Sequence, residues 1–149
     1  MAQGQLKVFA YYPYQAGLGA YNNSTDTFKL ALLTDAIGDI DENQVSPTLA
    51  SFNEASGGGQ YSAGGNALPG ASWNFNAGVT NQDFTDFSMS KGQGNPTGVK
   101  TALIINSTAG NHAINVIDLT TDGTTAIDVQ NNDLNIQFNA DGTFEVTVA

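Results

Sequence analysis

Apolar and polar residues alternate along several short stretches of the chain, which is the pattern of half-buried β-strands. The clearest case lies at the end of the sequence, where residues 134–138 and 144–148 each place an apolar side chain at every second position. Residues 139–142, between them, contain a glycine. Two amphipathic strands around such a turn predict a hairpin with one buried face.

Three other segments carry longer apolar runs. Residues 27–33 start with alternation and then become apolar throughout, which favours a strand covered on both faces, with a short buried helix as the alternative. Residues 99–105 predict a second buried strand, and residues 113–119 a third. In this third strand Ile114 and Val116 are expected to share the face opposite Ala113.

Alternation in residues 71–77 places Trp73 and Phe75 on the same side of a strand. Single aromatic residues at such positions usually belong to a core, and we expect this of Trp73. Stacking of Trp73 on a sugar is the alternative. Residues 84–90 alternate in the same way and predict one more strand.

The start of the chain is aromatic and β-prone, but Pro13 interrupts it, and residues 17–19 form a glycine-containing link. Chain ends usually fray, and amphipathic aromatic side chains are enriched in protein contacts. Residues 8–14 are therefore expected either to cap the domain or to add to a neighbouring subunit. The candidate interface side chains are Val8, Phe9, Tyr11, Tyr12, Tyr14 and Tyr61.

The remaining segments are rich in turn-forming residues. Residues 34–47 are acidic, with one helical turn expected near residues 34–37, and residues 47–52 predict another short element. Residues 57–65 surround Tyr61 with glycines and are expected to form a mobile loop anchored by that ring. Together with the loop at residues 92–98, this segment is a further candidate contact.

Many short strands joined by turns predict a mainly β protein. We expect an antiparallel β-sandwich or a flattened barrel, jelly-roll-like, with a C-terminal hairpin and at most one or two short helices. Residues 1–19 would form an aromatic arm with its link, and residues 20–149 a single β domain. The chain contains no cysteine, so packing alone must stabilise it.

The charge balance excludes several classes of function. The 149-residue chain has 14 acidic residues against four lysines and no arginine, which gives a net charge of -10. Nucleic-acid binding depends on clustered cations, so we expect no nucleic-acid partner. An anionic membrane surface would repel the chain, and no apolar run reaches the roughly 20 residues of a membrane-spanning helix.

The sequence offers little reactive chemistry. His112 is the only histidine, which is too few for a zinc site, and it is expected at a turn or on the surface. Residues 39–43 resemble the start of a calcium loop, but Gln44 and Ala50 occupy the positions that require glycine and glutamate, which leaves at most a weak cation site. The glycines at residues 57–65 lack the lysine of a phosphate loop. We therefore expect no enzyme, cofactor, metal or small-molecule ligand.

Several blocks, in order, resemble a set of small structural proteins of tailed bacteriophages. They are DTFKLALLT (residues 26–34), YSAGG (61–65), the strand with Trp73 and Phe75, ALII (102–105) and the C-terminal hairpin. Together they cover most of residues 26–148. The resemblance implies a largely β virion component without catalysis. The aromatic residues 8–14 depart from it, because a polar and helix-like opening would be expected there.

The resemblance and the charge together suggest a decoration (cement) protein on the outer head surface. A subunit of charge -10 would be repelled by packaged DNA, whereas outside the shell the charge keeps particles apart. Its expected partners are the major capsid protein and copies of itself, with a trimer as the first expectation. Such a protein is assembled in the host cytoplasm and resides in the virion. A tail or tail-tip subunit and a glycan-binding β module are the alternatives.

Overall fold

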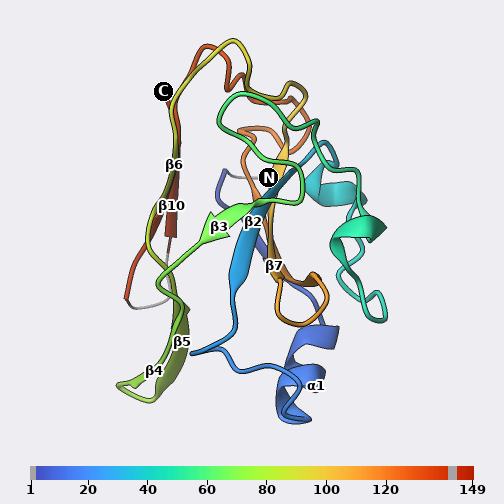
Figure 1. Ribbon diagram of the computed structural model, residues 1–149, viewed down its shortest axis with the longest axis vertical. Helices are drawn as coiled ribbons and strands as arrows, with labels where there is room; N and C mark the ends of the chain where they lie inside the picture. Colours follow the sequence, from blue (N-terminus) through green and yellow to red (C-terminus); the bar gives the residue numbers. More distant parts are fainter. Residues whose placement is uncertain (1–2, 141–143) are drawn as a thin grey trace.

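The computed structural model describes residues 3–140 and 144–149, and it is an antiparallel β-sandwich (Figure 1). The larger sheet has the strand order β1-β8-β7-β2-β3. Its strands are β1 (Leu6–Val8), β2 (Phe28–Leu33), β3 (Asn66–Leu68), β7 (Thr101–Asn106) and β8 (His112–Asp118). Every neighbouring pair in this sheet is antiparallel.

A second sheet, of order β10-β9-β6, forms the other layer. It contains β6 (Phe87–Met89), β9 (Leu134–Phe138) and β10 (Phe144–Val148), while β4 (Ser72–Asn76) and β5 (Val79–Asp83) form a separate hairpin. The described helical elements are α1 (Tyr11–Gly17) and the short 3-10 turns η1 (Ile37–Asp39) and η2 (Leu49–Ser51). The predicted mainly β sandwich with few short helices is confirmed. No helix in the described part is long and apolar enough to cross a membrane.

The main core lies between the two sheets. Leu30 and Leu32 of β2 point into it from the larger sheet, and Leu134 and Ile136 of β9 point into it from the smaller one. The predicted C-terminal hairpin is confirmed, with Phe138 paired to Phe144 and Val148 to Leu134. Part of its predicted turn, residues 141–143, lies outside the described residues.

A second core covers the opposite face of the larger sheet. Ala31 and Leu33 of β2 point into it, where the segment that contains η1 and η2 supplies Ile37 and Ile40. Phe9 joins the same cluster and is fully buried. The strand β2 thus lies between two cores, which confirms the prediction of a strand covered on both faces.

A β-bulge alters the predicted alternation of β8. The pairing shifts between Ile104 and Ile105 of β7, which leaves Ile114 as an extra residue on β8. Val116 therefore points into the second core beside Ala113, and Ile114 points into the main core. The expectation that Ile114 and Val116 share a face was wrong for this reason.

The N-terminal segment also differs from its prediction. Residues 6–8 form β1, which is hydrogen-bonded to β8 within the main sheet, so no break separates this part of the segment from the domain. Residues 11–17 form the helix α1 instead of continuing a strand. Pro13 is compatible with a helix here because it lies in the first turn, where backbone N–H groups lack helical partners anyway. The predicted link begins at the end of this helix, and Gly19 adopts a positive φ of 76° just beyond it.

Asn95 ties the loop at residues 57–65, which was expected to be mobile, to the loop at residues 92–98. Its side chain is buried; Oδ1 accepts from the Gln60 backbone N–H at 3.0 Å, and Nδ2 donates to the carbonyls of Ser90 and Val129 at 2.8 Å. A Cβ added to Gly59 would lie 2.4 Å from Asn95 Oδ1. Glycine at position 59 therefore permits the two loops to approach each other closely.

Candidate docking surface at one end of the sandwich

The β4–β5 hairpin projects from one end of the molecule, and its aromatic side chains are exposed. Ala77 and Gly78 turn the chain with φ values of 49° and 84°, which is the turn geometry typical of two-residue hairpins. Trp73 is 45% exposed and Phe75 is 77% exposed. The expectation that Trp73 belongs to the core was therefore wrong, although the predicted strand and its alternation are present.

The register shows which way this aromatic face points. Phe75 pairs with Thr80 and Trp73 pairs with Gln82, so these side chains share one face of the hairpin. The Tyr12 hydroxyl lies 3.3 Å from Gln82 Oε1, which links α1 to that face. The face is therefore turned toward the side of the molecule that carries the helix.

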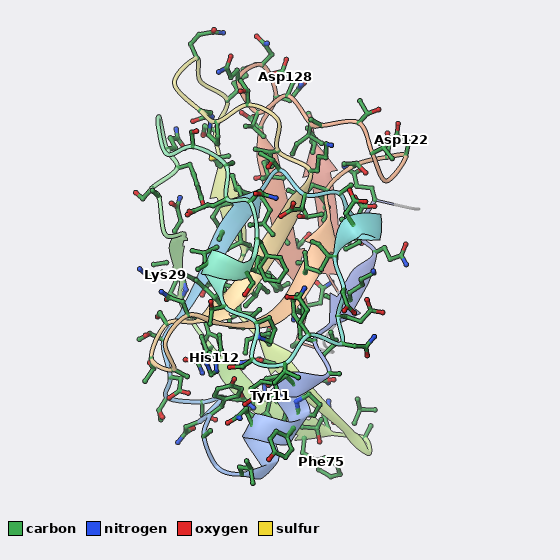
Figure 2. The ribbon with its side chains drawn as sticks, turned by 90° about the vertical axis from the view of Figure 1, so that its right-hand side faces the viewer. Tyr11, Lys29, Phe75, His112, Asp122 and Asp128 are labelled. Carbon is green, nitrogen blue, oxygen red and sulfur yellow. The ribbon has the colours of Figure 1, made fainter. Side chains whose placement is uncertain are left out.

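The helix adds further exposed apolar groups at the same end. Tyr14 is 59% exposed and Leu18, just after the helix, is 64% exposed. Figure 2 shows Phe75 and Tyr11 at one end and Asp122 and Asp128 toward the other. We define the apolar end by the side chains of Tyr14, Leu18, Trp73 and Phe75. Val79 pairs with Asn76, so its side chain lies on the opposite face of the hairpin.

Apart from Asp83, which ends β5 at the base of the hairpin, α1 and the β4–β5 hairpin contain no charged residue. The sequence carries no charge between Lys7 and Asp26, and none between Glu54 and Asp83. In a chain with a net charge of -10, the sequence neighbours of the apolar end are thus apolar, amide, hydroxyl and glycine residues. This combination of exposed aromatic rings and missing charge is typical of the centre of a protein interface.

The structure separates the six candidate interface residues. Val8 and Tyr14 are exposed, and Tyr11 and Tyr12 are half-buried. Phe9 and Tyr61 are buried, so their side chains belong to the interior of this chain and offer no surface to a partner. Phe75 and Leu18 were not among the residues predicted for an interface, although the absence of charge around them in the sequence was a usable signal.

An aromatic cluster with His112 holds α1 against the sandwich. Tyr12 stacks on Tyr21 with ring centroids 5.8 Å apart, and the Tyr21 hydroxyl lies 2.7 Å from His112 Nδ1. Tyr11 meets the edge of the His112 ring. Burial raises the pKa of Tyr12 to about 12, and burial also raises the pKa of Tyr21. His112, the first residue of β8, thus takes part in a packing contact.

Tyr61 anchors its glycine-rich loop from inside. Its hydroxyl donates to Glu54 Oε1 at 2.6 Å and accepts from the Leu32 backbone N–H at 3.0 Å. Burial and the hydrogen bond to the Glu54 carboxylate raise the pKa of Tyr61 well above its usual range. The predicted role of Tyr61 as a loop anchor is confirmed.

Several acidic side chains take part in local hydrogen bonds or ion pairs. The acidic residues in the described ranges include no group of three or more histidine, aspartate or glutamate residues placed to hold a metal ion. In the loop at residues 39–43, Asp41 Oδ1 accepts from the Asn43 backbone N–H, and Glu42 lies 3.1 Å from Lys7 Nζ.

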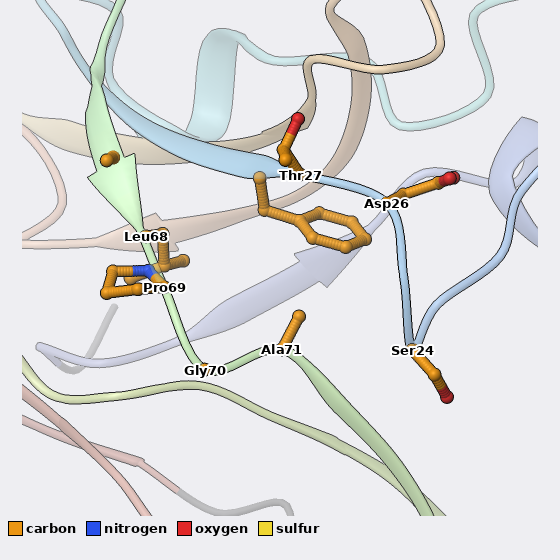
Figure 3. Close-up of a pocket in the computed structure, with 9 residues that line it drawn as sticks. Ser24, Asp26, Thr27, Leu68, Pro69, Gly70 and Ala71 are labelled. Carbon is orange, nitrogen blue, oxygen red and sulfur yellow. The ribbon is translucent and has the colours of Figure 1, made fainter.

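A shallow hollow of about 360 Å³ lies beside the base of the hairpin (Figure 3). Phe28, Leu68 and Pro69 give it an apolar lining. The Asp26 carboxylate at its rim is already engaged, since Oδ2 accepts from the Asn22 backbone N–H and from Asn106 Nδ2. The Thr27 hydroxyl, also in the lining, is likewise hydrogen-bonded within the chain, to Ser107 and Thr108.

No protein-family model, curated protein or solved structure matches this chain.

Replacement of Trp73 by alanine should leave the domain folded. Because the ring is 45% exposed, we expect Trp73→Ala to lower the free energy of unfolding by less than about 1.5 kcal/mol, against about 3–5 kcal/mol for a core aromatic. Phe87→Ala, in the core strand β6, is the matched control and should show the larger loss. Urea unfolding of both variants measures the difference, and equal losses would place Trp73 in the core.

Proposed function

We propose that this protein is a non-enzymatic structural component of a bacteriophage virion, a decoration (cement) protein on the outer surface of the head. The observation that carries the proposal is the division of the molecule into an uncharged apolar end and an acidic remainder. Such a molecule is suited to an assembly in which one end makes protein contacts and the acidic surface faces water.

The blocks that resemble phage structural proteins support the same role. They coincide with β2, the Tyr61 loop, β4, β7 and the C-terminal hairpin, which are the parts that build the sandwich and its projecting hairpin. A decoration protein binds the assembled coat and not free coat subunits, so it stabilises the shell by mass action. The major capsid protein is the partner that this role requires.

Immunogold electron microscopy tests the proposal. Antiserum against the purified chain should label the heads of particles produced by the phage or prophage that encodes it. Label confined to tails would favour the alternative of a tail or tail-tip subunit. Purified particles that contain no trace of the chain by mass spectrometry would refute both roles.

Exposed Trp73 also gives the glycan-binding alternative a specific basis. The ring lies on the same face of the hairpin as Thr80 and Gln82, and aromatic rings with nearby hydroxyls and amides suit the faces and hydroxyls of sugars. Binding of an oligosaccharide on a glycan array, lost in the folded Trp73→Ala variant, would establish this function instead.

A further inference from the structure

We infer that the apolar end is a self-association surface, and that its occupant is the apolar end of a second copy of this chain. The inference names the partner for a surface that the proposed function takes only as a protein contact. It shares with the proposed function only the premise that the apolar end makes a protein contact. Self-association and the virion role can therefore fail separately.

Among the residues that the structure describes, no sheet or helix covers the whole aromatic face of the hairpin. Trp73 and Phe75 lie on the same face of the hairpin as Gln82, and Gln82 contacts the helix through Tyr12. Beyond that contact, the two rings remain 45% and 77% exposed. A two-stranded hairpin alone is marginally stable in water, and an aromatic face of this kind is normally covered by another sheet or helix.

Charge selects a second copy as the covering partner. A protein of different sequence could be held by the acidic surface through its own lysines and arginines. A second copy brings the same charge of -10, so two copies can approach closely only where neither carries charge. The apolar end meets this condition, because the segments between Lys7 and Asp26 and between Glu54 and Asp83 are uncharged.

The exposed area is of the size that a stable contact requires. An aromatic side chain has about 150–250 Å² of surface, so the exposed parts of Tyr14, Trp73 and Phe75 amount to on the order of 300–400 Å². Leu18 adds to it, with an exposure of 64%. A stable interface buries about 800 Å² per partner, somewhat more than half of it apolar. The apolar end supplies most of that apolar part.

Light scattering coupled to size-exclusion chromatography tests the inference. The purified chain should elute as a defined dimer or trimer, and the double variant Trp73→Thr with Phe75→Thr should elute as a monomer with unchanged circular dichroism. Threonine removes the rings and retains strand propensity. Val45→Thr, which removes a side chain that is 84% exposed but lies outside the apolar end, is the matched control and should remain oligomeric.

Disulfide trapping gives a second measurement that does not depend on the double variant folding. The chain has no cysteine, so Thr80→Cys, on the same face as Phe75, introduces a single thiol. Mild oxidation should convert most of this variant to covalent dimers, whereas Thr121→Cys, exposed near Asp122, should remain largely uncrosslinked.

A wild-type chain that is monomeric at its highest soluble concentration would overturn the inference, as would an oligomer that survives in the double variant. A monomer that still labels phage heads would refute self-association and leave the virion role intact. An oligomer that is absent from phage particles would support self-association and refute the virion role. Binding of a monomer to an oligosaccharide would identify the apolar end as a glycan site.

Discussion

Asn95→Ala should lower the free energy of unfolding by about 3 kcal/mol, although the residue lies in a loop. The amide joins three segments, because it accepts from Gln60 and donates to Ser90 and Val129. Alanine leaves these backbone groups without their partners in a site that is 2% exposed. Each buried polar group that loses its hydrogen bond costs about 1–3 kcal/mol, partly recovered where water can enter.

Asn74→Ala is the matched control for this prediction. Asn74 is an exposed amide on β4, so its replacement should change stability by no more than about 0.5 kcal/mol. Urea unfolding monitored by circular dichroism measures both variants. If they lose equal stability, then the loops at residues 57–65 and 92–98 do not depend on Asn95.

The strands whose pattern of burial follows directly from their place in a sheet could be predicted from the sequence. The apolar run in β2 reflects the two cores on either side of it, and alternation in β9 and β10 reflects one buried face. In both cases periodicity along the strand directly records burial. The same reasoning failed at Ile114, because a bulge adds one residue and reverses every later position in the strand.

The docking surface shows a different limit of sequence reasoning. Trp73 and Phe75 alternate as core residues do, and the strand that carries them is present. Alternation reveals that one face of a strand is apolar, but not whether this chain or another molecule covers it. The distribution of charge supplies the missing information, because both segments around the apolar end lack it.

Contacts between distant residues could not be predicted. His112 and Tyr21 are 91 positions apart, and nothing in the local sequence of either residue indicates their 2.7 Å contact. The helix α1 was missed for a related reason. Its aromatic residues favour a strand by propensity. In the structure Tyr12 packs on Tyr21 from the helix, a tertiary contact that the local sequence does not indicate.

Stability should fall steeply as the pH rises from about 10 to about 12, because buried tyrosines hold their protons longer in the folded state than in the unfolded state. Burial raises the pKa of Tyr12 to about 12, and the pKa of Tyr61 is also raised, first by burial and then by Glu54. An unfolded tyrosine ionises near pH 10. The stabilisation from each raised pKa is therefore complete below pH 10 and is lost as the pH rises through the folded value.

Each such tyrosine lowers the free energy of unfolding by at most about 1.4 kcal/mol per pH unit in that window, and half-buried Tyr12 contributes less because solvent screens it. Urea unfolding at several pH values, with tyrosinate absorbance followed in parallel, measures the slope. Tyr61→Phe should flatten it, whatever stability the lost hydrogen bonds cost at neutral pH, while Tyr14→Phe, at an exposed ring, should leave it unchanged. A wild-type slope that Tyr61→Phe does not alter would mean that Tyr61 ionises in the folded protein as it does in water, and hence that its loop opens at high pH before the sandwich unfolds.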